Sequence, residues 1–168
     1  MQDTKTDSIA RLRQLLRQQR WASLATLDPQ GEIEGAMVAF VMDEGCQRGY
    51  LHLSQLASHT RNLLRQPQAA LTLSEPDLGE GDPQQLARVA LQITVHPIPP
   101  EHPNYPQARA RYLAALPDAE PRFDFADFHL LGFEWHKARL VGGFGQAFSY
   151  RPADLVGGAQ KLAEVEKK

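Results

Sequence analysis

The chain has 168 residues, of which 42% are hydrophobic and 23% charged, and this suits one domain with a sizeable core. Its formal net charge of −2 at pH 7 offers no overall attraction for a nucleic acid or an anionic membrane. A single cysteine, Cys46, excludes an internal disulfide and a multi-cysteine zinc site. The sequence also lacks a signal-like or membrane-spanning apolar run. It therefore predicts a soluble, cytoplasmic protein without a metal site that binds neither nucleic acid nor membrane.

The first predicted element is an amphipathic helix over residues 8–19. Its leucines and isoleucine recur at three- and four-residue spacing, and arginines occupy positions between them. We expect the apolar side of this helix to pack on the core and its arginines to face water.

A three-stranded meander is predicted next. Residues 21–27 and 32–42 are rich in apolar residues, and the turn between them contains a proline that presets φ and a glycine that accepts positive φ, so they form a β-hairpin. A second turn, at residues 43–49, leads to a strand over residues 50–53. Cys46 lies in this turn, where we expect an exposed thiol without a catalytic role.

A helix predicted over residues 58–66 follows this strand and ends before Pro67. Hydroxyl, imidazole and guanidinium side chains cluster in its first turn, at Ser58, His59, Thr60 and Arg61. A helix start offers unpaired N–H groups and a partial positive charge, so this cluster is suited to a phosphate. The alternative, equally favoured by local physics, is that Ser58 only caps the helix while His59 and Arg61 face water.

The second half of the chain returns to strands, predicted over residues 68–74 and 86–95. A loop rich in proline, glycine and acidic residues separates these two strands. A short helix over residues 105–116 and a loop over residues 118–124 come next.

Residues 127–150 contain two apolar arms that predict the last pair of strands. Glycines on both sides of Phe144 suggest a bulge or a close approach to a ligand or a partner chain. With Val141 and Phe148, Phe144 would extend an apolar face that a second subunit could close. The polar tail from about residue 153 has few apolar anchors, and we expect it to be partly disordered.

The predicted order is helix, three strands, helix, two strands, helix and two strands. Connections between the strands are mostly too short for parallel crossovers. We therefore predict a mainly β protein with flanking helices, in which residues 1–168 form a single antiparallel β-barrel domain.

Four segments of the sequence resemble FMN-binding split-barrel proteins related to pyridoxamine 5'-phosphate oxidase, and most closely the short haem-utilisation branch of that family. These segments are Trp21 to Gly31, Ser54 to Leu63, Pro67 to Leu71, and Asp127-Phe128 together with Gly142 to Ala147. The resemblance implies an antiparallel split β-barrel that forms a homodimer with cofactor sites at the subunit interface. It also implies an FMN-dependent oxidoreductase that acts on a small-molecule substrate.

The same resemblance implies the residues that would contact FMN. The flavin ring would lie along the second strand, and its phosphate would bind at the turn and helix that follow the third strand. An arginine on a later strand and a phenylalanine of the partner subunit would complete the site. These residues are Met37, Val38, Ala39, Phe40, Leu53, Ser54, Ser58, His59, Thr60, Arg61, Arg88 and Phe144. No catalytic residue is assigned. Met37 and Met42 stand where the oxidases have an arginine and a lysine, which weakens the expected phosphate binding from this strand. The arginine-containing terminal strand of the true oxidases has no match in this sequence, so pyridoxamine phosphate itself is not the expected substrate.

Haem is the alternative cofactor. The haem-utilisation branch implies a porphyrin at the dimer interface, an axial histidine from the C-terminal tail and an acidic residue that matches Asp127. No histidine follows His136 in this sequence, so the substitutes are His59, His129 and His136. The sequence therefore favours FMN over haem, and a barrel that binds neither cofactor is the third interpretation.

Overall fold

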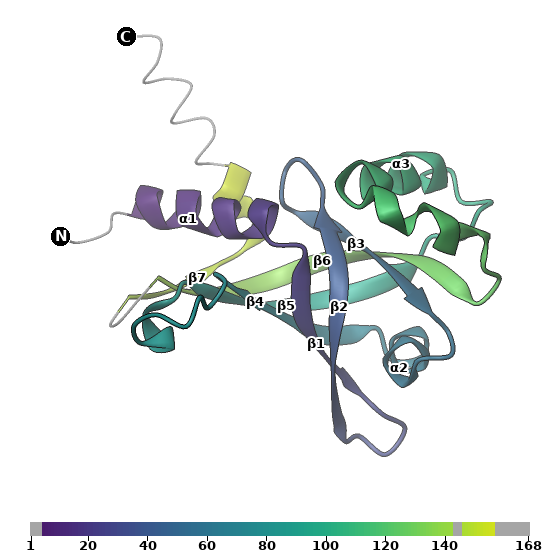
Figure 1. Ribbon diagram of the computed structural model, residues 1–168, viewed down its shortest axis with the longest axis horizontal. Coiled ribbons are helices and arrows are strands. Elements are labelled where there is room, and N and C mark those ends of the chain that lie inside the picture. Colours follow the sequence, from purple (N-terminus) through teal and green to yellow (C-terminus); the bar gives the residue numbers. More distant parts are fainter. Residues whose placement is uncertain (1–4, 143–145, 157–168) are drawn as a thin grey trace, which may run out of the picture.

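The computed structural model describes residues 5–142 and 146–156. Its elements follow the predicted order (Figure 1). They are α1 (Lys5–Gln18), β1 (Trp21–Leu27), β2 (Ile33–Met42), β3 (Arg48–Ser54), α2 (Ser58–Arg65), β4 (Gln68–Ser74), η1 (Pro83–Gln85), β5 (Arg88–Pro97), α3 (Tyr105–Ala115), η2 (Pro117–Asp124), β6 (Phe128–Val141) and β7 (Ala147–Tyr150). The loop predicted over residues 118–124 is wrong, because this segment forms the 3₁₀ helix η2, which buries Ala119.

The strands form one antiparallel sheet that closes on itself. Their order is β3-β2-β1-β4-β5-β6-β7, and the pairing of β3 with β6 closes six of the strands into a barrel. The seventh strand, β7, pairs with β6 beyond the closed ring. This arrangement confirms the prediction of a mainly β protein with flanking helices, built as an antiparallel split β-barrel.

The barrel interior is filled by alternate residues of its strands, since successive side chains of a strand point to opposite faces. In β1, for example, Ala22, Leu24 and Thr26 are buried while their neighbours are more exposed. Large side chains that are fully buried in this core are Leu12, Phe40, Leu91, Phe133 and Trp135.

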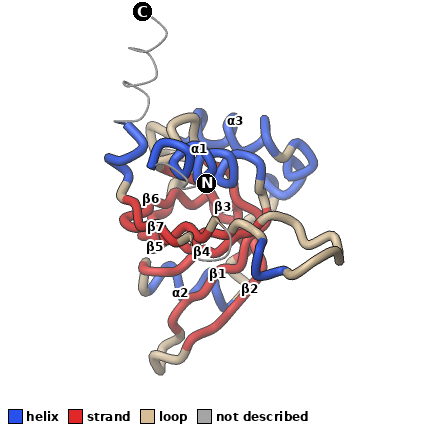
Figure 2. Tube along the Cα trace, turned by 90° about the vertical axis from the view of Figure 1, so that its left-hand side faces the viewer, coloured by secondary structure: helices blue, strands red, loops and turns tan. Residues whose placement is uncertain are grey.

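The helices cover the barrel on two sides. Figure 2 shows α1 and α3 on one side of the strands and α2 on the other. A second, smaller core forms where α3 and η2 pack against the outside of the barrel, and it includes Val41, Ile98, Tyr112 and Leu130. This second core borders a cavity.

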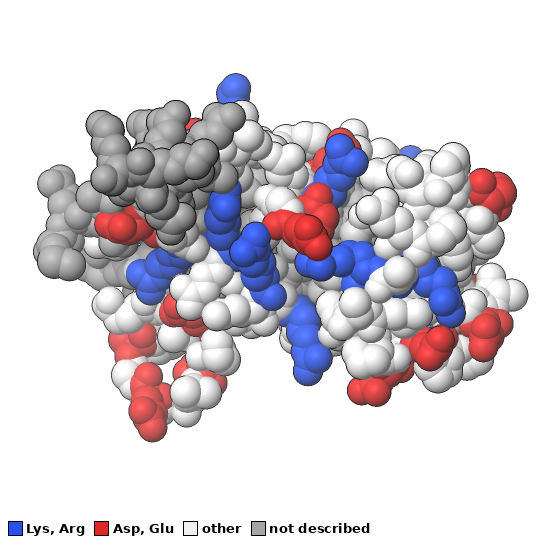
Figure 3. Space-filling view, turned by 90° about the horizontal axis from the view of Figure 1, so that it is seen from above, with Lys and Arg blue, Asp and Glu red and all other residues white. Residues whose placement is uncertain are grey.

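The arginines of α1 do not simply face water, as the sequence analysis expected. Arg11 donates to the carbonyl of Gly142 at 2.6 Å, Arg13 to that of Leu155, and Arg17 to that of Glu44 at 2.8 Å. Figure 3 shows further basic side chains among acidic ones on this face of the molecule. The helix therefore connects segments that are distant in sequence, because its arginine side chains donate hydrogen bonds to the backbone carbonyls of those segments.

Cys46 is buried, so the prediction of an exposed thiol is wrong. The residue has a positive φ of 56°, and its carbonyl accepts a hydrogen bond from Trp135 Nε1 at 2.7 Å. This bond draws the turn onto the barrel, and the resulting burial raises the pKa of the Cys46 thiol. A buried thiol with a raised pKa is a poor nucleophile.

The start of the C-terminal tail has an anchor that the sequence analysis did not assign. Residues 152–156 are helical, and Leu155 is buried in the barrel core. Asp154 also forms an ion pair with Lys5 at 3.3 Å. Across the described ranges, no helix has the length and apolar character needed to cross a membrane.

Candidate functional site

The helix that was predicted to bind a phosphate, α2, begins directly after the turn that follows β3. The N-cap residue is Ala57 rather than Ser58, and no side chain caps the first turn. The prediction of Ser58 as the N-cap is therefore wrong by one position. The Ser58 hydroxyl does not cap the helix and instead donates to the carboxylate of Glu34 on β2.

Glu34 is the centre of a polar network that attaches α2 to the barrel. Its second carboxylate oxygen accepts a hydrogen bond from Asn62 Nδ2 at 2.8 Å, and the same amide lies 3.2 Å from Thr26 Oγ1 on β1. A carboxylate beside a helix N-terminus is stabilised by the helix dipole. A negative charge of the chain itself therefore lies beside the first turns of α2, held by side chains and not by the backbone N–H groups of the helix.

The other first-turn residues of α2 differ in their accessibility. Arg61 is exposed, and its Nη1 donates to the carbonyls of Gln55, at 3.2 Å, and Leu56, at 2.5 Å. Thr60 is fully buried, and its hydroxyl has no hydrogen-bond partner within the described residues. His59 is half-buried, and no hydrogen bond to its ring is found in the same part of the chain.

Burial lowers the pKa of His59, and the nearby Glu34 carboxylate opposes this shift. The imidazole is therefore unprotonated at neutral pH, with a lone pair available on one ring nitrogen. Because the ring is half-exposed, a ligand can reach it from solvent.

The predicted flavin-binding residues of β2 point in two directions. Met37 is 50% exposed and Ala39 is partly exposed, whereas Val38 and Phe40 are buried inside the barrel. A ring lying along this strand would contact the side chains of Met37 and Ala39, but only the backbone of the other two residues.

The end of β3 is joined to the start of β6. Leu53 is buried in the core, and Ser54 Oγ donates to a carboxylate oxygen of Asp127 while accepting from the N–H of Leu56 at 3.1 Å. The next residue, Gln55, donates its N–H to the carbonyl of Asp127 at 2.6 Å, and its side-chain oxygen lies 2.8 Å from His129 Nε2. These hydrogen bonds therefore hold the turn that was predicted to bind phosphate against Asp127.

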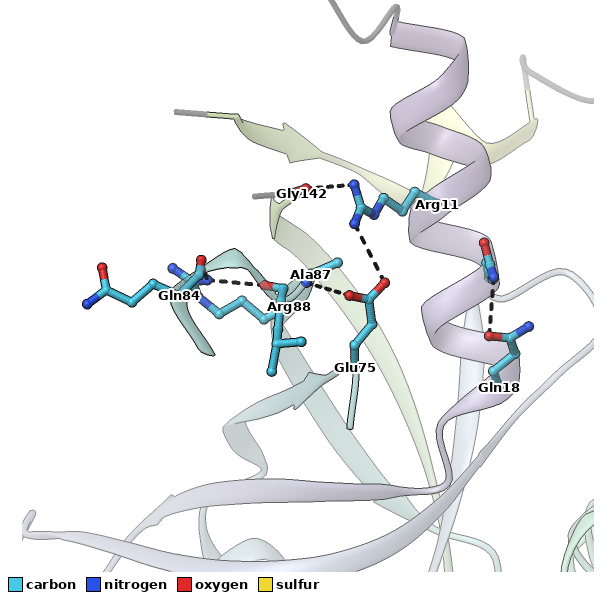
Figure 4. A network of polar contacts seen from close by, with 9 residues as sticks. Arg11, Gln18, Glu75, Gln84, Ala87, Arg88 and Gly142 are labelled. Atoms are coloured by element: carbon cyan, nitrogen blue, oxygen red, sulfur yellow. Dashed lines mark hydrogen bonds and ion pairs between the residues drawn. The ribbon is translucent and has the colours of Figure 1, made fainter. Parts of the chain in front are cut away.

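Arg88 lies away from this turn. It pairs with Ser74 at one end of β4, whereas Gln68, which follows α2, is at the other end. Arg88 Nη1 donates to the carbonyls of Gln84, at 3.0 Å, and Leu86, at 3.2 Å. Figure 4 shows it beside the ion pair between Arg11 and Glu75. Within one subunit, Arg88 does not join the α2 residues, and Phe144 lies outside the described residues.

The sequence analysis missed three polar residues, two on barrel strands and one on α2. Glu34 interrupts a predicted apolar strand, and Asn62 follows Ser58 by four positions, which places both side chains on one face of α2. His52, in turn, is a polar residue within the apolar strand β3, and it is only 7% exposed. A polar residue within an otherwise apolar strand was therefore the signal by which the sequence could have shown Glu34 and His52. Within residues 5–142 and 146–156, no cluster of three or more His, Cys, Asp or Glu side chains is placed to hold a metal ion.

The families and proteins to which this chain is similar are consistent with the fold described above. The model of the family described as "CREG, beta-barrel" matches residues 3–154. The chloroplastic haem oxygenase HOZ of Arabidopsis thaliana is 32% identical over 121 residues, which cover 71% of this chain and 35% of HOZ. The chain thus spans about a third of this curated relative.

Two solved structures illustrate the range of similar proteins. A haem-binding protein from Mycobacterium smegmatis has 26% identity and a TM-score of 0.77, covering 94% of this chain and 62% of its own. An FAD-binding protein from Mesorhizobium loti has 10% identity and a TM-score of 0.61, covering 77% of this chain and 90% of its own. The second similarity concerns the fold alone.

Proposed function

We propose that this chain, which belongs to the CREG β-barrel family of split barrels, binds haem at the junction of β3 and α2. The proposal rests on the burial, the protonation and the hydrogen bonding of the His59 side chain. Its imidazole is half-buried, unprotonated at neutral pH and without a hydrogen bond in the described part of the chain. Neutral imidazole is a common axial ligand of haem iron.

Two neighbours of His59 suit the rest of a porphyrin. Arg61 is exposed and could form a charge-assisted hydrogen bond with a propionate. Leu56, which is 78% exposed, offers an apolar surface to the ring. Haem would supply an iron that binds oxygen, whereas the protein residues would hold the iron and orient the ring.

The other two histidines that the sequence offered are already engaged. His129 Nε2 lies 2.8 Å from Gln55 Oε1, and His136 Nε2 lies 2.7 Å from Thr94 Oγ1. Either residue would have to give up this contact to bind iron through Nε2, whereas His59 would not. We therefore propose His59 as the axial ligand.

The position of Glu34 reverses the preference for FMN that the sequence suggested. Its carboxylate already accepts from Ser58 and Asn62, so a phosphate at the start of α2 would meet a like charge. The haem-binding relative, at 26% identity, is also nearer in sequence than the FAD-binding one, at 10%. Both observations favour haem.

Titration of the protein with haem tests this proposal. We expect a Soret band that saturates at one haem per chain, and that shifts and weakens in His59→Ala. The matched controls are His129→Ala and His136→Ala, which should keep the wild-type spectrum. A wild-type spectrum in His59→Ala would refute His59 as the ligand, and the absence of saturable binding would refute the function. A reductant added in air then shows whether the bound haem is degraded.

FMN is the second candidate, because no side chain caps the first turn of α2 and the Thr60 hydroxyl lacks a partner within the described residues. Such donors suit a phosphate. If FMN binds there, Glu34→Gln should raise its affinity about tenfold, since the opposing charge is removed. Fluorescence quenching of FMN measures this, and riboflavin is the control because it has no phosphate.

We also propose that the protein is a homodimer that uses the outer face of β1 and β2. Trp21, Ile33 and Met37 are 57%, 80% and 50% exposed on this face. Ser23 pairs with Met37 on one side and with Thr72 on the other, so the centre of the face is uncharged. The face expected around Val141 and Phe148 is less suitable, because Phe148 is partly buried against the barrel core.

A further inference from the structure

A cavity of about 430 Å³ lies outside the barrel, where η2 and the segment before α3 meet β3 and β6. Its walls include the rings of Phe123, Phe125 and Phe128, and its polar lining includes His52, Glu101 and Asp124. The volume is in the range of small-molecule sites. His59 and Arg61, the residues proposed to hold haem, do not line it.

His52 is the unusual residue of this cavity. Its ring stacks on Phe123 with centroids 3.8 Å apart and planes 8° from parallel, and Phe128 lies 5.1 Å away. The residue is 93% buried, and its Nδ1 atom has no hydrogen-bond partner within the described residues. Burial lowers the pKa of His52 to about 4, so the ring is uncharged at neutral pH.

The missing partner of Nδ1 indicates which nitrogen carries the proton. A buried N–H without an acceptor is rarer in proteins than an acceptor without a donor. The favoured tautomer therefore has its lone pair at Nδ1 and its N–H at Nε2. Because His52 lines the cavity while Nδ1 is closed off, the Nε2 side of the ring is the side that a ligand can approach.

The charges at the cavity restrict the ligand further. Glu101 and Asp124 are exposed members of the lining. Two cations lie nearby without lining the cavity: the Arg109 guanidinium is 5.1 Å from the centroid of the Phe123 ring, and Arg122 is close enough for its charge to act on His52. The carboxylates of the lining would repel an anionic ligand, while the aromatic walls favour a planar apolar one. Phe125 is 53% exposed, so the cavity has an aromatic side chain at the solvent boundary.

We propose that this cavity binds a small, uncharged aromatic molecule that carries an oxygen acceptor. The ligand packs against Phe125 and Phe128, and its oxygen accepts a hydrogen bond from Nε2 of His52. This binding is independent of the haem site proposed above, since the two sets of residues differ.

Three naphthalene probes test the proposal. These are 2-acetylnaphthalene, which is uncharged and has an acceptor, 2-ethylnaphthalene, which lacks the acceptor, and 2-naphthoate, which is anionic. We expect the acetyl probe to bind at least about tenfold more tightly than the ethyl probe, the gain of one hydrogen bond, and the naphthoate to bind most weakly. Probe fluorescence gives the affinities, and NMR of the histidine ring nitrogens locates the contact.

Two variants sharpen the test. His52→Phe keeps a stacking ring and should remove the preference for the acetyl probe, whereas His136→Phe, outside the cavity, should keep it. Equal binding of the acetyl and ethyl probes by the wild type would overturn the proposal. So would tightest binding of the naphthoate, or no saturable binding of any probe. Because the affinities of the three probes are compared in the wild type, they test the proposal even if His52→Phe does not fold.

Discussion

Two glycines of the barrel strands differ in the space around them. A Cβ atom added at Gly49 on β3 would overlap the ring of Phe133, whereas one added at Gly35 on β2 would meet no heavy atom within 4 Å. Gly49 is therefore required by the close approach of an aromatic ring. Gly35 has no such constraint on its exposed strand position.

We expect Gly49→Ala to lower the free energy of unfolding by about 1 to 3 kcal/mol, because Phe133 is fully buried and has no room to move. The matched control is Gly35→Ala, which should change the free energy of unfolding by less than about 1 kcal/mol. Urea denaturation measures both. Equal stability of the two variants would contradict the tight packing around Phe133.

His52 couples the stability of the fold to pH. Its pKa is about 4 in the folded protein, below the ordinary 6.5, so the unfolded chain binds more protons between these values. Stability should therefore fall as the pH is lowered through this window. From pH 7 to 4.5, we expect the wild type to lose about 2 kcal/mol more than His52→Phe.

Thermal or urea unfolding at several pH values gives this difference. His59 and His96 also have lowered pKa values because of burial, but they contribute equally to both proteins. Parallel pH dependence of the wild type and His52→Phe would show that His52 is protonated without cost in the folded state.

At the scale of the elements, the attachment of α2 depends on Asn62. Its amide donates to both Glu34 and Thr26, and replacing it by alanine leaves the Glu34 carboxylate with one donor fewer. We expect Asn62→Ala to lower the free energy of unfolding by about 1 to 3 kcal/mol and to speed hydrogen exchange in α2. The control is Gln14→Ala, because Gln14 forms an exposed pair with Gln18 at 3.3 Å. Unchanged exchange in α2 would contradict this role.

Periodicity and turn residues predicted the order of the elements and the approximate bounds of most of them, because both are local signals. The strand over residues 21–27 was predicted with the bounds that the structure has. Contacts between distant segments were not predictable in this way. The burial of Cys46 depends on Trp135, 89 positions later, and the side chain of Ser58 turns toward Glu34 on another element. The sequence therefore predicted candidate residues in the first turn of α2, but not the side chains that contact them.

At the scale of the whole molecule, the described residues include an apolar face on the outside of β1 and β2. Trp21 and Met37 are exposed on neighbouring strands, and pairing places Met37 opposite Ser23, so the aromatic and thioether side chains lie on the same uncharged surface. Large exposed apolar side chains that are contiguous mark an interface more often than scattered ones do. A symmetric partner would bury both copies of this face at once.

We therefore expect light scattering at micromolar concentration to give a mass near twice 18.8 kDa. Met37→Glu should shift the protein toward the monomer, because a carboxylate would be buried against its symmetric copy or its apolar surroundings. The control is Leu78→Glu, since Leu78 is 81% exposed and lies in the loop before η1, outside the strands β1 and β2. A wild-type mass of 18.8 kDa would contradict the dimer. A dimer that Met37→Glu leaves intact would place the interface on another face of the barrel.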